Sequence, residues 1–158
     1  MKEKKKLILL SGILIVLIVL IILLSINIKQ KESFVKPEFD TNVLNEVPEN
    51  IEYKNSTLNI AENYDIYING LPTIENNKLI VDFISMKENN VWIKIRVLNN
   101  KEKVIAESGL VKPGEYLKSI TLKKRISNEE KITYMIIGYE IDTYMSAGTV
   151  KLNTRIGE

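Results

Sequence analysis

One uninterrupted apolar run, residues 7–28, constrains where the rest of this chain is placed. The run has no charged residue, and only Ser11, Gly12, Ser25 and Asn27 interrupt its aliphatic side chains. An α-helix rises about 1.5 Å per residue, so a helix of this length extends about 33 Å, which matches the roughly 30 Å hydrocarbon core of a bilayer. We therefore predict one N-terminal transmembrane helix over residues 7–28.

The charges that flank the run predict its orientation. Residues 1–6 contain four lysines and Glu3, whereas residues 29–38 contain three lysines and two glutamates. Positive flanks stay cytoplasmic, so we expect residues 1–6 to be a cytoplasmic tail and the C-terminal domain to be extracellular. A cleaved signal peptide has a shorter apolar core of about 7–15 residues, followed by small residues. Residues 25–29 offer no such cleavage site, so we expect an uncleaved anchor in the cell membrane.

Composition excludes several kinds of chemistry. The chain has no Cys and no His, which excludes disulfides, thiolate nucleophiles, histidine acid–base catalysis and ordinary zinc or haem sites. We therefore expect no cofactor and no metal. The full chain has 22 basic and 20 acidic residues, and four of the lysines lie in the N-terminal tail. The remainder lacks the concentrated basic face of nucleic-acid-binding proteins, so we expect no nucleic-acid partner.

The sequence beyond the anchor divides into a linker and a β-rich domain. Residues 29–50 are polar, contain Pro37 and Pro48 and show no apolar periodicity, so we predict a stalk that links the anchor to the domain. The alternatives are that Phe34, Phe39 and Val43-Leu44 dock on the domain or mark a short helix that begins at Asp40. From residue 51 to 158, short alternating runs are separated by turn residues every 8–12 positions, which is typical of an antiparallel sandwich. We predict an all-β, immunoglobulin-like antiparallel β-sandwich of about seven strands.

The seven expected strands are placed by their alternation of apolar and polar residues. They cover residues 64–68, 78–85, 91–98, 104–107, 116–123, 131–142 and 149–156. Residues 58–61 also alternate and are compatible with a strand of their own, and residues 131–142 suit either a central strand or a strand bent near Gly138. Residues 91–98 and 104–107 form an expected hairpin. Lys112-Pro113-Gly114-Glu115 fits a type II turn, because Gly114 can supply the positive φ at its third position.

Part of the domain is similar to a known group of proteins. The likeness rests on Glu88-Asn89-Asn90, the alternation Val91-x-Ile93-x-Ile95-x-Val97, Glu107-Ser108-Gly109-Leu110-Val111-Lys112-Pro113-Gly114, and Ile120-x-Leu122. In these stretches the chain resembles uncharacterised single-span, surface-exposed β-sandwich proteins of Gram-positive bacteria. The resemblance implies an accessory envelope protein, of a kind sometimes found with mobile or secretion elements. Those proteins usually place a Gly before the Tyr that opens the penultimate strand, whereas here residues 128–131 precede it without a Gly.

Candidate ligand-binding residues lie on the polar face of the strand at residues 91–98. Trp92, Lys94 and Arg96 alternate on that face, and an aromatic ring beside cations suits stacking on a glycan or peptide. Packing against the domain is the alternative role of Trp92. The cluster Lys123-Lys124-Arg125 suits an anionic polymer less well than a solvated turn, because salt screens such exposed charges.

Catalysis has little support in the sequence. Glu140 and Asp142 are spaced to share a strand face, as paired carboxylates would, but no flanking residues suggest a cleft. We therefore expect a non-enzymatic, membrane-anchored interaction or structural subunit of a cell-envelope assembly, for example one for conjugation or secretion, that is bound to a protein partner. The alternative is a module that binds cell-wall glycan or an anionic wall polymer.

Overall fold

The structure, a computed structural model, describes residues 4, 6, 12–21, 34–49, 51, 58–60 and 64–157. The chain divides into two compact units, residues 1–35 and 36–158. In the first unit residues 12–21 are helical, and their large apolar side chains are 49–63% exposed. Within the described residues no helix is long and apolar enough to cross a membrane. The other positions of the predicted span, 7–11 and 22–28, lie outside the described residues.

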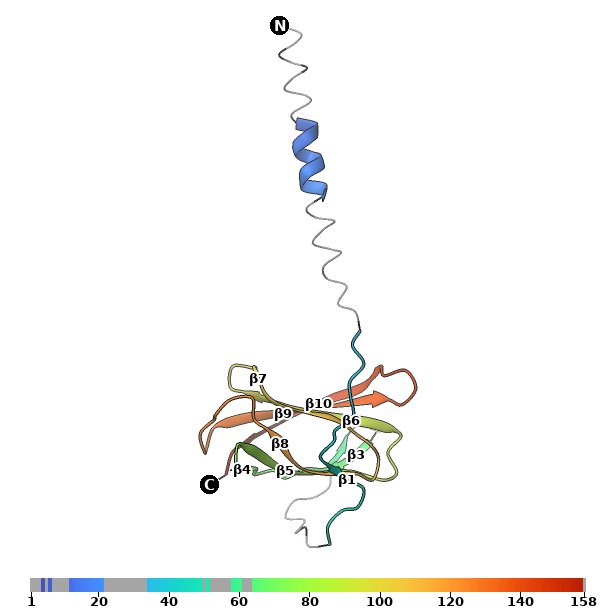
Figure 1. Cartoon of the computed structure of the whole chain (residues 1–158), viewed down its shortest axis with the longest axis vertical. Coiled ribbons are helices and arrows are strands. Elements are labelled where there is room, and N and C mark those ends of the chain that lie inside the picture. The colour runs from blue at the N-terminus through green and yellow to red at the C-terminus, as the bar shows by residue number, and fades with distance from the viewer. Residues whose placement is uncertain are drawn as a thin grey trace. The chain divides into compact units, whose positions relative to one another are not determined.

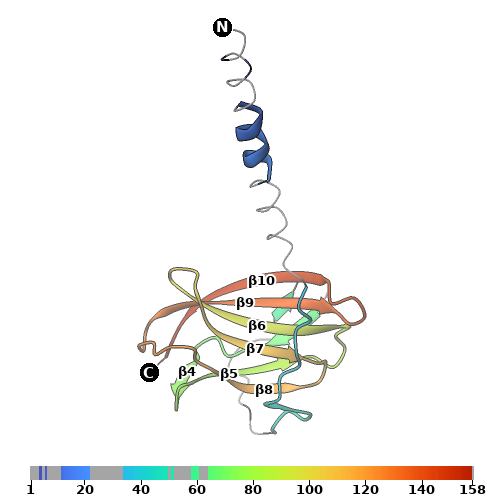
Figure 2. The same cartoon turned by 45° about the horizontal axis from the view of Figure 1, so that its top comes forward.

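The second unit is a sandwich of two antiparallel sheets (Figure 1). The larger sheet contains β1 (Val43–Leu44), β2 (Leu58–Ile60), β3 (Tyr64–Tyr67), β4 (Thr73–Glu75), β5 (Lys78–Ser85) and β8 (Tyr116–Thr121). The smaller sheet contains β6 (Val91–Asn99), β7 (Val104–Val111), β9 (Lys131–Glu140) and β10 (Ser146–Arg155). The strand order of the larger sheet is β1-β8-β5-β3-β2, with β4 also paired to β5. The strand order of the smaller sheet is β10-β9-β6-β7, and Figure 2 shows these four strands side by side.

The core lies between the sheets because each strand turns alternate side chains inward. The fully buried side chains come from both sheets and include Leu79, Val81 and Phe83 of β5 and Ile93, Ile95 and Val97 of β6. β9 lies between β10 and β6, as an interior strand should, and contributes Tyr134 and Ile136. Burial of this apolar surface is the main force that holds the two sheets together.

All seven predicted strands are present in the structure, with ends that differ by a few residues. The largest difference is in β7, which runs from Val104 to Val111 rather than stopping at residue 107. The alternating stretch near residue 58 is a separate strand, β2, paired with β3. The predicted hairpin joins β6 and β7. Gly114 has a φ of 82°, and the Glu115 amide donates to the Lys112 carbonyl at 3.1 Å, as the type II turn requires.

The domain begins earlier than the sequence suggests. Residues 36–49, placed in the expected stalk, belong to the compact second unit. Phe39 forms a parallel bridge with Leu110 of β7, and β1 then pairs with β8 in the other sheet. The segment therefore crosses from the edge of one sheet to the edge of the other. Its pairing is nonlocal, so the polar composition of residues 29–50 favoured a linker over docking of Phe39 and Val43-Leu44 on the domain. The expected linker residues 29–33 lie outside the described residues.

A bulge in β7 makes room for this segment. Ser108 and Gly109 lie opposite Ile95 where the β6–β7 register shifts, and the Ile95 amide donates to the Ser108 hydroxyl at 2.9 Å. The hydroxyl thus replaces the backbone acceptor that the bulge displaces. A Cβ on Gly109 would lie 2.4 Å from the Asp40 backbone nitrogen. Only glycine allows the two backbones to approach so closely.

Candidate functional site

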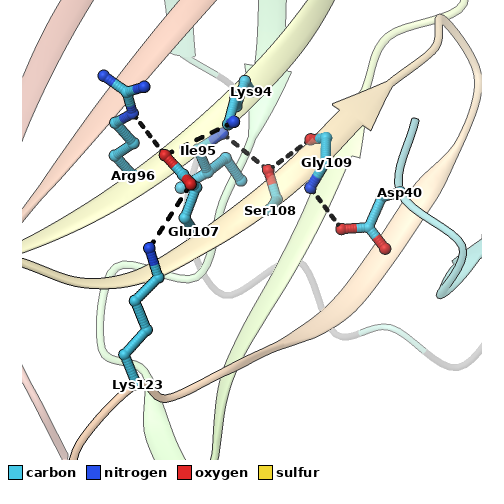
Figure 3. Close-up of polar contacts among 8 residues, drawn as sticks. All are labelled: Asp40, Lys94, Ile95, Arg96, Glu107, Ser108, Gly109 and Lys123. Carbon is cyan, nitrogen blue, oxygen red and sulfur yellow. Dashed lines mark hydrogen bonds and ion pairs between the residues drawn. The ribbon is translucent and has the colours of Figure 1, made fainter. Parts of the chain in front are cut away.

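Two of the three predicted ligand-binding side chains contact one carboxylate. On the outer face of the four-stranded sheet, Glu107 accepts a hydrogen bond from Arg96 Nε at 2.7 Å (Figure 3). The ammonium groups of Lys94 and Lys123 lie 3.5 and 3.6 Å from its two carboxylate oxygens. β6 and β7 bring this cluster together, because Arg96 and Glu107 are register partners. The cationic groups of Lys94 and Arg96 are therefore engaged within the domain.

The charges around Glu107 lower its pKa. Burial alone would raise the pKa of this carboxyl, but the hydrogen bond from Arg96 and the charges of Lys94 and Lys123 outweigh it, so the pKa falls below the usual value. The Lys94 side chain is only 14% exposed. A largely buried ammonium needs such a counter-ion, so the cluster has a clear structural role in joining β7 to β6.

Trp92 lies on the same face but in a separate, aromatic cluster. Its ring centroid is 4.8 Å from that of Phe39, in an edge-to-face arrangement, and 4.8 Å from that of Tyr144. Lys36 lies over the Tyr144 ring at 4.2 Å, and Lys112 over the Phe39 ring at 4.7 Å. These aromatic and cation–π contacts stabilise the attachment of the N-terminal segment to the sheet. The structure thus gives Trp92 packing partners inside the domain.

The run from Ser108 to Gly114, on which part of the family resemblance rests, has a structural explanation throughout. Ser108 and Gly109 form the bulge, and the Gly109 amide donates to the Asp40 carboxylate at 2.8 Å (Figure 3). Leu110 pairs with the N-terminal segment, and residues 112–115 form the turn. These residues therefore attach the N-terminal segment to β7 and form the turn that follows it.

Two further groups of polar residues have local roles. The Tyr116 hydroxyl donates to the Asp82 carboxylate at 2.5 Å, where β5 bulges and Asp82 adopts a φ of 40°. Burial, together with this bond, raises the pKa of Tyr116. Glu140 ends β9 and accepts a hydrogen bond from Thr143, whereas Asp142 lies in the following turn, so the two carboxylates do not share a strand. Among the described residues no group of three or more acidic side chains is placed to hold a metal ion.

The outer edge of β10 at residues 149–153 is a surface whose position the sequence did not reveal. β7, at the opposite edge of the four-stranded sheet, is paired with residues 38–40, but in the described part of the chain no strand pairs with the outer side of β10. The Tyr64 hydroxyl donates to the Gly148 carbonyl at one end, and Thr154 donates to the Gly70 carbonyl at the other. Between these contacts, residues 149–153 alternate exposed and half-buried side chains.

Alternation alone predicts such a strand but not its position at an edge. That position depends on which strands pair: β10 pairs with the preceding strand β9, whereas β9 pairs with β6, from Asn99 with Ile132 to Val91 with Glu140, far apart in the sequence. Comparison of the chain with protein-family models, curated proteins and solved structures finds no match.

Proposed function

We propose that this chain is a non-catalytic, membrane-anchored interaction subunit of a cell-envelope assembly. Residues 7–28 anchor it, residues 1–6 are cytoplasmic, and the sandwich is extracellular. The uncharged apolar run and its basic N-terminal flank support the anchor and its orientation. The edge of β10 at residues 149–153, with which no strand of the described residues pairs, is the observation that supports binding to a protein partner.

We further propose that the sandwich is immunoglobulin-like. The order β10-β9-β6-β7 matches the order G-F-C-C′ of that fold, and β3-β5-β8 matches A-B-E in the opposite sheet. β1 occupies the place next to β8 where strand D lies in that fold. The N-terminal segment joins both sheets, so the edges at β7 and β8 are occupied, whereas no strand of the described residues pairs with the outer side of β10 at residues 149–153.

An open sheet edge presents unpaired backbone donors and acceptors that an added strand can satisfy. In β10 the exposed side chains of residues 149–153 include Lys151, which charges the edge and disfavours nonspecific aggregation. A partner strand would gain backbone hydrogen bonds from the edge and specificity from the side chains on either face. We expect an extended segment of another envelope protein to add to β10.

Site-specific photo-crosslinking in native membranes tests this proposal. A photoreactive residue replaces Thr149 or Lys151 in the full chain, and the matched control carries it at Lys118, an exposed position on β8 in the other sheet. We expect the same single partner to be captured from both β10 positions and not from Lys118. Capture from Lys118 alone, or of no protein at any of the three positions, would contradict the proposal.

The alternative, a wall-binding module built on Trp92, Lys94 and Arg96, has weaker support. Contacts within the domain engage the cationic groups of Lys94 and Arg96 and flank the Trp92 ring with two other rings. A glycan would have to compete with these contacts. Binding of the full chain to purified cell wall that is lost in Trp92→Ala, without a crosslinked protein partner, would favour this alternative.

A further inference from the structure

An open hollow of about 770 Å³ lies across the ends of β9 and β10. It extends from Asn100, in the turn after β6, across residues 131–133 and 153–155 to Leu71. Its volume is within the range of about 300–1,000 Å³ that is typical of small-molecule sites. The clusters around Glu107 and Trp92 contribute no residue to it, so it is a separate surface of the domain.

Two cations face each other at this hollow. Arg155 of β10 and Lys131 of β9 are register partners, both are exposed, and both line the hollow. Neither forms an ion pair with an acid among the residues that the structure describes, in contrast to Lys94 and Lys151. Like charges directly opposite each other across two strands are unfavourable. An anion bound between them would remove that repulsion.

The other residues that line the hollow indicate which chemical groups the ligand carries besides its negative charge. Next to the cations, the Thr133 hydroxyl donates to the Asn153 side-chain oxygen at 2.9 Å. Glu129, which has a φ of 65°, and Asn100 add acceptors to the wall of the same hollow. Arg binds phosphate through two parallel hydrogen bonds, and carboxylate and amide oxygens accept hydrogen bonds from hydroxyl groups. A bare phosphate would leave Glu129 unused and would be repelled by it.

We propose that this hollow binds a phosphate-bearing polyol, with Lys131 and Arg155 contacting the phosphate and Glu129 and Asn100 contacting hydroxyl groups. Such a group occurs either as a free small molecule or as the repeating unit of an anionic polymer. The proposal does not depend on the anchor or on the partner of β10.

Calorimetric titration of the full chain in mild detergent tests the proposal with three probes: inorganic phosphate, glycerol 3-phosphate and a short glycerol-phosphate oligomer. We expect glycerol 3-phosphate to bind more tightly than inorganic phosphate. Tighter binding of the oligomer would identify the polymer as the source, and equal binding per phosphate would identify the small molecule. Failure of all three probes to bind, or equal affinity for phosphate and glycerol 3-phosphate, would overturn the proposal.

Arg155→Glu and Lys118→Glu make the same change in net charge, but only Arg155 lines the hollow. Comparing the two variants therefore distinguishes binding at the hollow from general electrostatic attraction of the anion to the protein. In Arg155→Glu the new carboxylate faces Lys131, so we expect an unchanged or higher Tm together with at least a tenfold loss of affinity for glycerol 3-phosphate. In Lys118→Glu we expect affinity to change less than twofold. Equal losses in the two variants, or unchanged affinity in Arg155→Glu, would overturn the proposal.

Glu129→Gln tests the hydroxyl contacts separately. We expect it to reduce the preference for glycerol 3-phosphate over inorganic phosphate, because the amide is a weaker acceptor and no longer repels the bare anion. An unchanged preference would overturn the role given to Glu129.

Discussion

A single carboxylate, Glu107, holds Lys94, Arg96 and Lys123 on the outer face of the four-stranded sheet. Its side chain is 25% exposed, and that of Lys94 is 14% exposed. Isolated surface ion pairs contribute little, but a partly buried carboxylate that contacts several cations leaves them uncompensated when it is removed. The contribution of Glu107 therefore depends on its charge.

We predict that Glu107→Gln lowers the free energy of unfolding at pH 7 by about 1–2 kcal/mol. The folded state lowers the pKa of Glu107 below its ordinary value of 4.5, so the charge contributes stability that is fully present above about pH 4.5. That contribution is lost as the pH falls through the lowered pKa. Chemical denaturation of both proteins at several pH values between 7 and 3 measures whether the difference between them shrinks.

Glu102→Gln is the matched control for this prediction. Glu102 is 82% exposed and contacts only Lys151, at 3.6 Å, among the cations of the described residues. We expect this variant to change the free energy of unfolding by less than about 0.5 kcal/mol at any pH. A loss as large as that of Glu107→Gln would show that general charge balance, and not the cluster, accounts for the effect.

At the scale of strands, β3 depends on a side chain for part of its attachment. Only Ile66 and Tyr67 of β3 pair with β5. The Asn89 side chain then continues the pairing, because its oxygen accepts from the Asp65 amide and its nitrogen donates to the Asp65 carbonyl, both at 2.8 Å. An asparagine amide thus takes the place of a residue in a neighbouring strand.

Asn89→Ala should therefore loosen β3 from β5. We expect a loss of about 1–3 kcal/mol in the free energy of unfolding, because the Asp65 amide loses the acceptor in Asn89 and the Asp65 carbonyl keeps only the Met86 amide, at 3.3 Å. Hydrogen exchange should accelerate at Asp65 and Ile66. Asn90→Ala, at the adjacent exposed position without a hydrogen bond to β3, should leave both measurements unchanged. Equal effects of the two variants would contradict this role of Asn89.

The same elements explain how far the sequence predicts this fold. Alternation located β6 and β10, because strands that bury one face carry a period of two residues whatever their partners are, whereas β9 was expected from a long run that is apolar on both faces. Residues 38–40 and β1 were assigned to the expected stalk, since their partners in β7 and β8 lie about seventy positions away in the sequence. Trp92, Lys94 and Arg96 were correctly placed on the outer face, but their partners Phe39 and Glu107 become neighbours only in the folded sheet.

The hollow was missed for the same reason. Lys131 and Arg155 lie on different strands, and neither carries a local pattern that indicates a site. Their juxtaposition follows from the β9–β10 register alone.

For the whole molecule, the proposed anchor decides where the domain and its β10 edge can act. Residues 12–21 are helical and have exposed apolar side chains, which supports a helix that contacts lipid. We predict that the full chain stays in membranes through alkaline extraction, and that Leu14→Arg together with Leu17→Arg releases it. Each arginine at the centre of a span costs about 2.5–3.5 kcal/mol on insertion scales. Val104→Arg, at an exposed position of β7, is the control and should leave the chain in the membrane.

The orientation of the chain can be read from single cysteines, because the native sequence has none. Lys101→Cys lies in the exposed turn between β6 and β7, and Lys4→Cys lies in the basic tail. If residues 1–6 are cytoplasmic, a membrane-impermeant maleimide should label Lys101→Cys in intact cells and label Lys4→Cys only after the membrane is permeabilised. Labelling in the reverse pattern would place the domain in the cytoplasm, where an envelope partner could not reach β10. The edge of β10 belongs to the sandwich alone, so the two proposals can fail independently. If alkaline extraction released the full chain but crosslinking at β10 still captured a partner, the proposed anchor would be wrong and the proposed role of the edge would stand.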